Sequence, residues 1–132
     1  YRSINLIGKV SAGNPCYAYE EIINTYKIPS NILCPSKNYF ILEVKGDSMN
    51  KIYPPGDLIL IESTNLVNND DIVIAVIDDE ATCKKINFSP NEIILTPQST
   101  NPIHQVQIYK DINVHILGKV LGKLSDYIRK DE

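Results

Sequence analysis

The run Tyr-Phe-Ile-Leu-Glu-Val-Lys-Gly-Asp-Ser-Met at residues 39–49 decides how the rest of the chain is interpreted. Its first six residues form an extended apolar stretch that is typical of a strand. The Gly-Asp-Ser that follows favours a turn, because all three residue types are common in turns. A serine placed behind a glycine at a strand end has exposed backbone amides nearby and little side-chain crowding. A nucleophile beside an oxyanion site has these requirements. The Ser48 hydroxyl is therefore a candidate nucleophile, and the Ser48 backbone amide is a candidate oxyanion donor.

The neighbouring segments predict further short strands separated by turns. The run at residues 71–77 is continuously apolar after its first residue, Asp71, which indicates burial on both faces. The acidic residues 78–80 predict a tight hairpin after it. The expected strands occupy residues 39–44, 57–62, 71–77, 81–86, 92–96 and 114–121, with another around Ile108. This spacing predicts a mainly β domain, as a barrel or sandwich of short antiparallel strands.

The first 37 residues carry a weaker pattern. Leu6, Ile7 and Val10 predict a short strand, which a Ser-Ala-Gly-Asn-Pro sequence interrupts. Residues 17–37 show no clear period and are expected to form a long connection. A helical period is nowhere sustained for ten residues, although residues 17–26 and 121–130 come nearest to one.

Size and charge exclude several functional classes. The 132 residues suffice for one domain with a real core, and no apolar run is long enough to span a bilayer. The net charge of −3 and the pI of about 5.4 argue against direct DNA binding, for which a basic face is expected. We therefore expect a protein with no membrane association, located in the cytoplasm.

Metal and cofactor chemistry find no support in the sequence. Cys16, Cys34 and Cys83 are odd in number and lack Cys-x-x-Cys spacing, which argues against a disulfide framework and a zinc site and favours reduced thiols. The acidic residues 78–80 are more typical of a solvated hairpin tip than of a metal site. A Gly-rich phosphate-binding loop is also lacking. We expect no cofactor and no metal.

A serine nucleophile requires a base, and the sequence offers histidine or lysine. Nothing in the spacing places His104 or His115 beside Ser48. A lysine can serve if burial keeps it neutral, because desolvation lowers the pKa of an ammonium group. Lys84 and Lys85 are adjacent on a predicted strand and therefore point to opposite faces. The alternation of side chains along the strand slightly favours Lys84 as the base, but both lysines remain candidates.

Four motifs now appear in order along the chain. They are Gly-Asp-Ser-Met at 46–49, Pro-Gly-Asp-Leu-Ile-Leu-Ile at 55–61, Asp-Ile-Val-Ile-Ala at 71–75, and Asp-Asp-Glu-Ala-Thr-Cys-Lys-Lys-Ile at 78–86. Together they resemble the LexA-type self-cleaving peptidases of family S24, which include LexA repressors, lambdoid phage repressors and the UmuD polymerase subunit. The resemblance extends from about Leu6 to Val120.

The resemblance implies a Ser-Lys dyad on a β-rich fold shared with bacterial signal peptidases. Matched to the family motifs, Ser48 is the nucleophile and Lys84 is the general base, so the resemblance chooses Lys84 where alternation could not. Cys83 stands where a valine is common, a small apolar exchange. The backbone amides of Asp47 and Ser48 are the implied oxyanion donors.

The family also cleaves itself at an Ala-Gly or Cys-Gly bond upstream of the serine. The sequence Leu-Ile-Gly-Lys-Val-Ser-Ala-Gly at 6–13 is similar to that element, which places the scissile bond between Ala12 and Gly13. We expect residues 1–132 to be a single autopeptidase and dimerisation domain, with a cleavage-site segment at 5–20 and a catalytic core at 38–122.

The resemblance further implies partners. A RecA–single-stranded DNA filament is the implied stimulus of cutting, in response to DNA damage. The chain is expected to be a homodimer, with residues 114–121 as a candidate contact. DNA binding would come from an N-terminal helix-turn-helix domain, which we expect to be absent from this chain. Two alternatives remain: a UmuD-like subunit of a translesion polymerase, and a dimerisation module of a phage-type repressor that no longer cuts.

Overall fold

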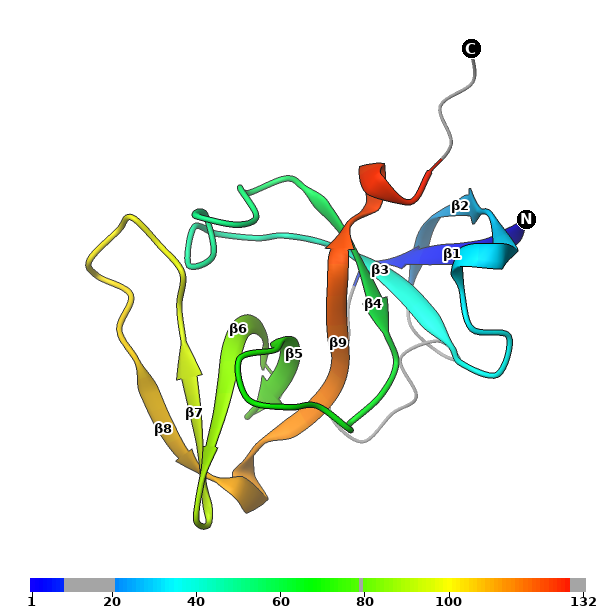
Figure 1. Cartoon of the computed structure of the whole chain (residues 1–132). Coiled ribbons are helices and arrows are strands. Elements are labelled where there is room, and N and C mark those ends of the chain that lie inside the picture. Colours follow the sequence, from blue (N-terminus) through cyan, green and yellow to red (C-terminus); the bar gives the residue numbers. More distant parts are fainter. Residues whose placement is uncertain (9–20, 79, 129–132) are drawn as a thin grey trace.

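The strands form one mixed sheet. The structure is a computed structural model that describes residues 1–8, 21–78 and 80–128. Within these residues nine strands follow the order β2-β1-β3-β4-β9-β5-β6-β7-β8 (Figure 1). Their bounds are β1 Arg2–Ile7, β2 Ile22–Ile28, β3 Tyr39–Glu43, β4 Leu58–Glu62, β5 Ile72–Ile77, β6 Glu80–Ser89, β7 Glu92–Thr96, β8 Gln107–Lys110 and β9 His115–Lys123. The mainly β prediction is confirmed.

Strand pairing is antiparallel with one exception. β1 and β3 pair in parallel through Leu6 and Ile41, so the expectation of antiparallel strands alone was incomplete. Short 3-10 turns follow three strands, at Ser30–Ile32, Asp111–Asn113 and Leu124–Asp126. None of the described helices is long and apolar enough to cross a membrane.

The prediction of a long connection over residues 17–37 was wrong. β2 lies inside it and pairs antiparallel with β1 along its whole length. Only its last residue, Ile28, is buried and Tyr26 is half-buried, because β2 is an edge strand whose other side chains are exposed. An edge strand of this kind leaves no apolar period in the sequence. The weak helical patterns also failed, since residues 22–26 lie in β2 and residues 121–123 in β9.

The core explains why β5 is apolar throughout. Val73 and Ala75 pack into a cluster with side chains of β6 and β7. Ile74, on the opposite face, packs into a second cluster that includes Phe40 and Ile61. Both faces of β5 are therefore buried, as its sequence predicted.

β9 connects the two halves of the sheet. It pairs with β4 on one side and with β5 on the other, and Figure 1 shows it between the β1–β2 end and the β7–β8 hairpin. The approach of β9 to β4 is close: a Cβ placed on Gly118 would lie 2.7 Å from the Glu62 carbonyl oxygen and would overlap Ile61. β5 pairs with residues 115–119 of β9 and β4 pairs with residues 119–123, so only Lys119 has a strand partner on both sides. The dimer contact expected at residues 114–121 stays a prediction.

Candidate active site

Ser48 lies in a tightly held loop after β3. This nucleophile loop, residues 45–53, begins after Val44, whose N–H donates to the Asp57 carbonyl over 2.8 Å. Gly46 then takes a φ of +72°, a left-handed conformation that a side chain would strain. Met49, only 1% exposed, anchors the loop in the interior. The turn expected from Gly-Asp-Ser is therefore present, and it presents Ser48 on the surface side of a buried methionine.

Lys84 reaches Ser48 from β6. Opposite Val73 of β5, it directs its Nζ to within 3.0 Å of the Ser48 Oγ. The same Nζ lies 2.5 Å from the Oγ1 of Thr82, which shares its face of the strand. Lys85 points to the other face and forms a 3.5 Å ion pair with the exposed Asp70. The structure thus brings together the two predicted dyad side chains and separates Lys85 from them.

Burial increases the fraction of Lys84 that is neutral and able to accept a proton. Desolvation lowers the pKa of Lys84, since the partly buried ammonium form loses hydration. Within the described part of the chain no carboxylate forms an ion pair with it. The adjacent Cys83 does not supply a negative charge either, because burial raises the pKa of its thiol to about 12. These surroundings favour a neutral amine.

The two predicted oxyanion donors differ in their surroundings. Among the described residues, the Ser48 N–H has no hydrogen-bond acceptor. The pKa of the Asp47 carboxyl is lowered by hydrogen bonds from Asn101 and His104 and, more weakly, by its own backbone N–H. The Asp47 amide therefore already interacts with its own side chain, which leaves the Ser48 amide as the freer donor.

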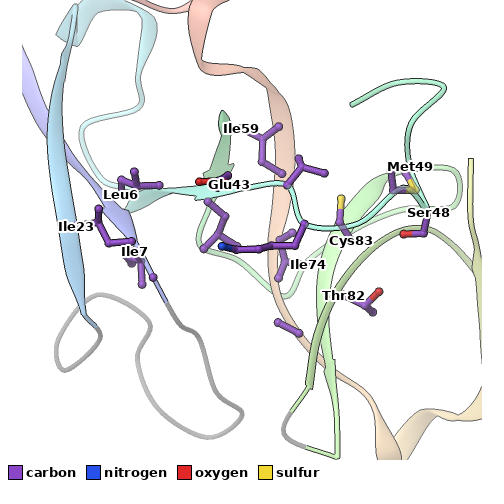
Figure 2. A pocket seen from close by; sticks show the side chains of 15 residues that line it. Leu6, Ile7, Ile23, Glu43, Ser48, Met49, Ile59, Ile74, Thr82 and Cys83 are labelled. Carbon is purple, nitrogen blue, oxygen red and sulfur yellow. The ribbon is translucent and has the colours of Figure 1, made fainter. Parts of the chain in front are cut away.

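A cleft of about 480 Å³ leads to Ser48. Figure 2 shows Leu6, Ile7 and Ile23 at one end and Ser48 with Thr82 at the other. Gly8 also lines the cleft. A cleft whose lining is mostly apolar, with a hydroxyl at one end, suits a peptide segment with apolar side chains.

The proposed scissile residues, Ala12 and Gly13, lie outside the described residues. Both flanks of their segment are described, however. Gly8, in the cleft, donates its N–H to the carbonyl of Glu21 over 2.8 Å. The described residues contain no group of three potential metal ligands.

Sequence reasoning missed the connection between β7 and β8. The Gln98 N–H donates to the Ser48 carbonyl, and the Gln98 carbonyl accepts from the Lys51 N–H, both over 2.9 Å. His104 and Asn101, from the same connection, bind the Asp47 carboxylate. His104 thus lies beside the motif but contacts Asp47, and neither histidine is hydrogen-bonded to the Ser48 side chain among the residues that the structure describes.

A serine hydroxyl within hydrogen-bond distance of a partly buried lysine amine is the arrangement of serine hydrolases that use lysine in place of histidine. The model of the Peptidase S24-like family matches residues 5–121, and the chain belongs to this family. The resemblance inferred from the four motifs is confirmed.

Curated relatives of the chain carry the name LexA repressor. The protein of Clostridium novyi (strain NT) is 38% identical over 128 residues, covering 95% of this chain and 61% of that protein. The protein of Caldicellulosiruptor saccharolyticus is 41% identical over 118 residues, covering 89% and 56%. That of Clostridium perfringens (strain SM101 / Type A) is 40% identical over 120 residues, covering 90% and 57%. The chain therefore spans little more than half the length of these relatives.

Proposed function

We propose that this chain is the self-cleaving and dimerising domain of a LexA-like repressor, which cuts its own Ala12–Gly13 bond with Ser48 and Lys84. The observation that carries the proposal is the 3.0 Å contact between the Ser48 Oγ and the Lys84 Nζ at the end of the cleft. Family membership and the similarity to LexA repressors support it.

The chemistry begins with proton transfer from the Ser48 hydroxyl to the neutral Lys84 amine. The Ser48 Oγ attacks the Ala12 carbonyl carbon, and the resulting oxyanion is stabilised by the Ser48 N–H, with Asp47 as the second predicted donor. The Lys84 ammonium then gives its proton to the departing Gly13 nitrogen, which leaves an ester between Ala12 and Ser48. Water attacks this ester while Lys84 takes its proton, and Lys84 returns that proton to the departing Ser48 Oγ. This restores the Ser48 hydroxyl and the neutral amine, and the new Ala12 carboxyl group ionises in solution.

Cutting within one chain is supported by where the segment is attached. Gly8 lines the cleft and is hydrogen-bonded to Glu21, so both flanks of residues 9–20 lie at the cleft. Ala12 is four residues beyond Gly8, and four extended residues span at most about 14 Å. An intramolecular reaction of this kind draws on a large effective molarity once the segment is docked.

Docking is then the controllable step, which makes the domain a switch. The family resemblance implies that a RecA–single-stranded DNA filament promotes docking during the SOS response to DNA damage. It also implies that the domain dimerises and that a helix-turn-helix domain elsewhere in the repressor binds DNA. Adding the filament to the purified chain at neutral pH should accelerate cutting, and analytical ultracentrifugation should show a dimer.

The deciding experiment incubates the purified chain at neutral and alkaline pH and determines the fragment masses. We expect one cut, between Ala12 and Gly13. It should accelerate by up to about tenfold per pH unit until Lys84 is neutral, because only the neutral amine can accept the proton. Ser48→Ala and Lys84→Ala should both abolish cutting.

Lys85→Ala is the matched control, since Lys85 neighbours Lys84 in sequence and points to the other face. The Lys85→Ala variant should cut itself at the rate of the unmodified chain. Cutting that survives Lys84→Ala would refute the assignment of the base, and a cut at any other bond would refute the scissile pair.

A further inference from the structure

The Asp47 carboxylate lies immediately before the proposed nucleophile and is bound by the β7–β8 connection. The Nε2 of His104 lies 2.5 Å from its Oδ1, and the Nδ2 of Asn101 donates to its Oδ2 over 3.0 Å. Each carboxylate oxygen therefore has its own partner. Because Asp47 lies more than fifty residues before Asn101 and His104, this contact ties two distant segments together.

The geometry of Asn101 is itself fixed. Its Oδ1 accepts from the Ile103 N–H over 3.1 Å, so its Nδ2 must face outward to Asp47. The N–H of His104 in turn donates to the Asn101 carbonyl over 3.3 Å. The connection thus forms a preorganised receptor for one carboxylate.

The position of that carboxylate matters for the reaction. Acyl transfer to Ser48 develops negative charge beside the Asp47–Ser48 amides, and a free carboxylate there would oppose it. Binding by His104 and Asn101 holds the carboxylate in place and disperses its charge. The hydrogen bonds of Gln98 to Ser48 and Lys51 hold the loop backbone, but they do not act on this charge.

We propose that His104 and Asn101 form a carboxylate clamp on Asp47 that positions the nucleophile loop for self-cleavage, with His104 as a positioning residue. This inference rests on the proposed function. His104 contacts neither of the dyad side chains within the described residues, so its effect must be transmitted through Asp47.

The test compares His104→Phe, His104→Gln and the control His115→Phe, which alters the exposed histidine of β9. Glutamine places an N–H donor near the position of the histidine Nε2, whereas phenylalanine has none. We expect His104→Phe to cut about ten to a hundredfold more slowly, the range associated with small displacements of reacting groups. His104→Gln should recover most of the rate, and His115→Phe should match the unmodified chain.

Two further measurements do not depend on cutting. In His104→Phe, amide hydrogen exchange over residues 45–53 should accelerate, and the pKa of the Asp47 carboxyl measured by NMR should rise. Circular dichroism would establish that the variants are folded. Unchanged exchange, an unchanged Asp47 titration or an unchanged cutting rate in His104→Phe would overturn the clamp. A chain that never cuts, but in which exchange and titration respond, would refute the proposed function and retain the contact.

Discussion

Replacing Lys84 by methionine should affect activity and stability in a way that depends on pH. Methionine preserves most of the side-chain length but cannot accept a proton. Loss of a general base slows a reaction by about 10²–10⁴-fold, which corresponds to roughly 3–5 kcal/mol in the activation barrier. The variant also loses two hydrogen bonds, to Ser48 and to Thr82, each worth about 1 kcal/mol of net stability.

The stability loss should be largest at alkaline pH. Burial lowers the pKa of Lys84 below its ordinary 10.5, so between the folded and unfolded pKa values the unfolded chain binds more protons. The stability of the unmodified chain therefore rises with pH through that window, and below it the buried ammonium offsets the hydrogen bonds. The Lys84→Met variant has no ionisable group at this position, so its stability does not rise with pH in this window. We expect a deficit of about 2 kcal/mol near pH 10.5 and a smaller one at pH 7.

The assay is urea denaturation at both pH values, with Gly13→Val in both proteins so that cutting does not compete with unfolding. Cutting itself is measured by mass in proteins without Gly13→Val. Lys85→Met is the control, because its exposed ion pair contributes under about 1 kcal/mol and its side chain does not reach Ser48. A deficit that is larger at pH 7 than at pH 10.5 would refute the inference that burial disfavours the charged form of Lys84.

Three other predictions follow from contacts around the site and the sheet. Thr82→Val removes one hydrogen bond to the Lys84 amine and should slow cutting roughly fivefold in the fragment-mass assay, the equivalent of about 1 kcal/mol; an unchanged rate would show that Thr82 does not orient the amine. Gly118→Ala should lower the free energy of unfolding in urea by about 1–3 kcal/mol, because its Cβ would meet the Glu62 carbonyl and Ile61. Iodoacetamide at pH 8 should alkylate Cys34 at least about tenfold faster than Cys83, since hydrogen bonds from Ser36 lower the pKa of the Cys34 thiol and burial raises that of Cys83; equal rates would contradict the burial of Cys83.

Strands with a buried face could be predicted from the sequence, and strands without one could not. β5 was found because both of its faces pack into the core, and its apolar run records that burial. β2 was missed because six of its seven residues are at least partly exposed. Three isoleucines, a threonine and a tyrosine are residue types that favour strands, but without an alternation of apolar and polar residues this composition did not stand out.

The candidate site also contains residues that could be predicted from the sequence and residues that could not. Ser48 and its turn were visible because glycine at position 46 and a buried residue at 49 are local requirements. Choosing Lys84 over Lys85 needed either the family motif or the register of β6 on β5, and a single sequence contains only the alternation. The contact of His104 with Asp47 spans 57 positions and has no local signal at all.

The position of β9 gives the sheet a mechanical role in the chemistry. Ser48 follows β3, in the half of the sheet that contains β1 to β4, whereas Lys84 belongs to β6, in the half that contains β5 to β8. β9 is the strand that joins these halves. The distance between the nucleophile and its base therefore depends on how the two halves are held together, at β9 and through the hydrogen bonds between the Ser48 loop and the β7–β8 connection. A change in the twist at β9 would alter the Ser48–Lys84 distance, and with it the rate of the reaction, without any change in the chemical identity of the site residues.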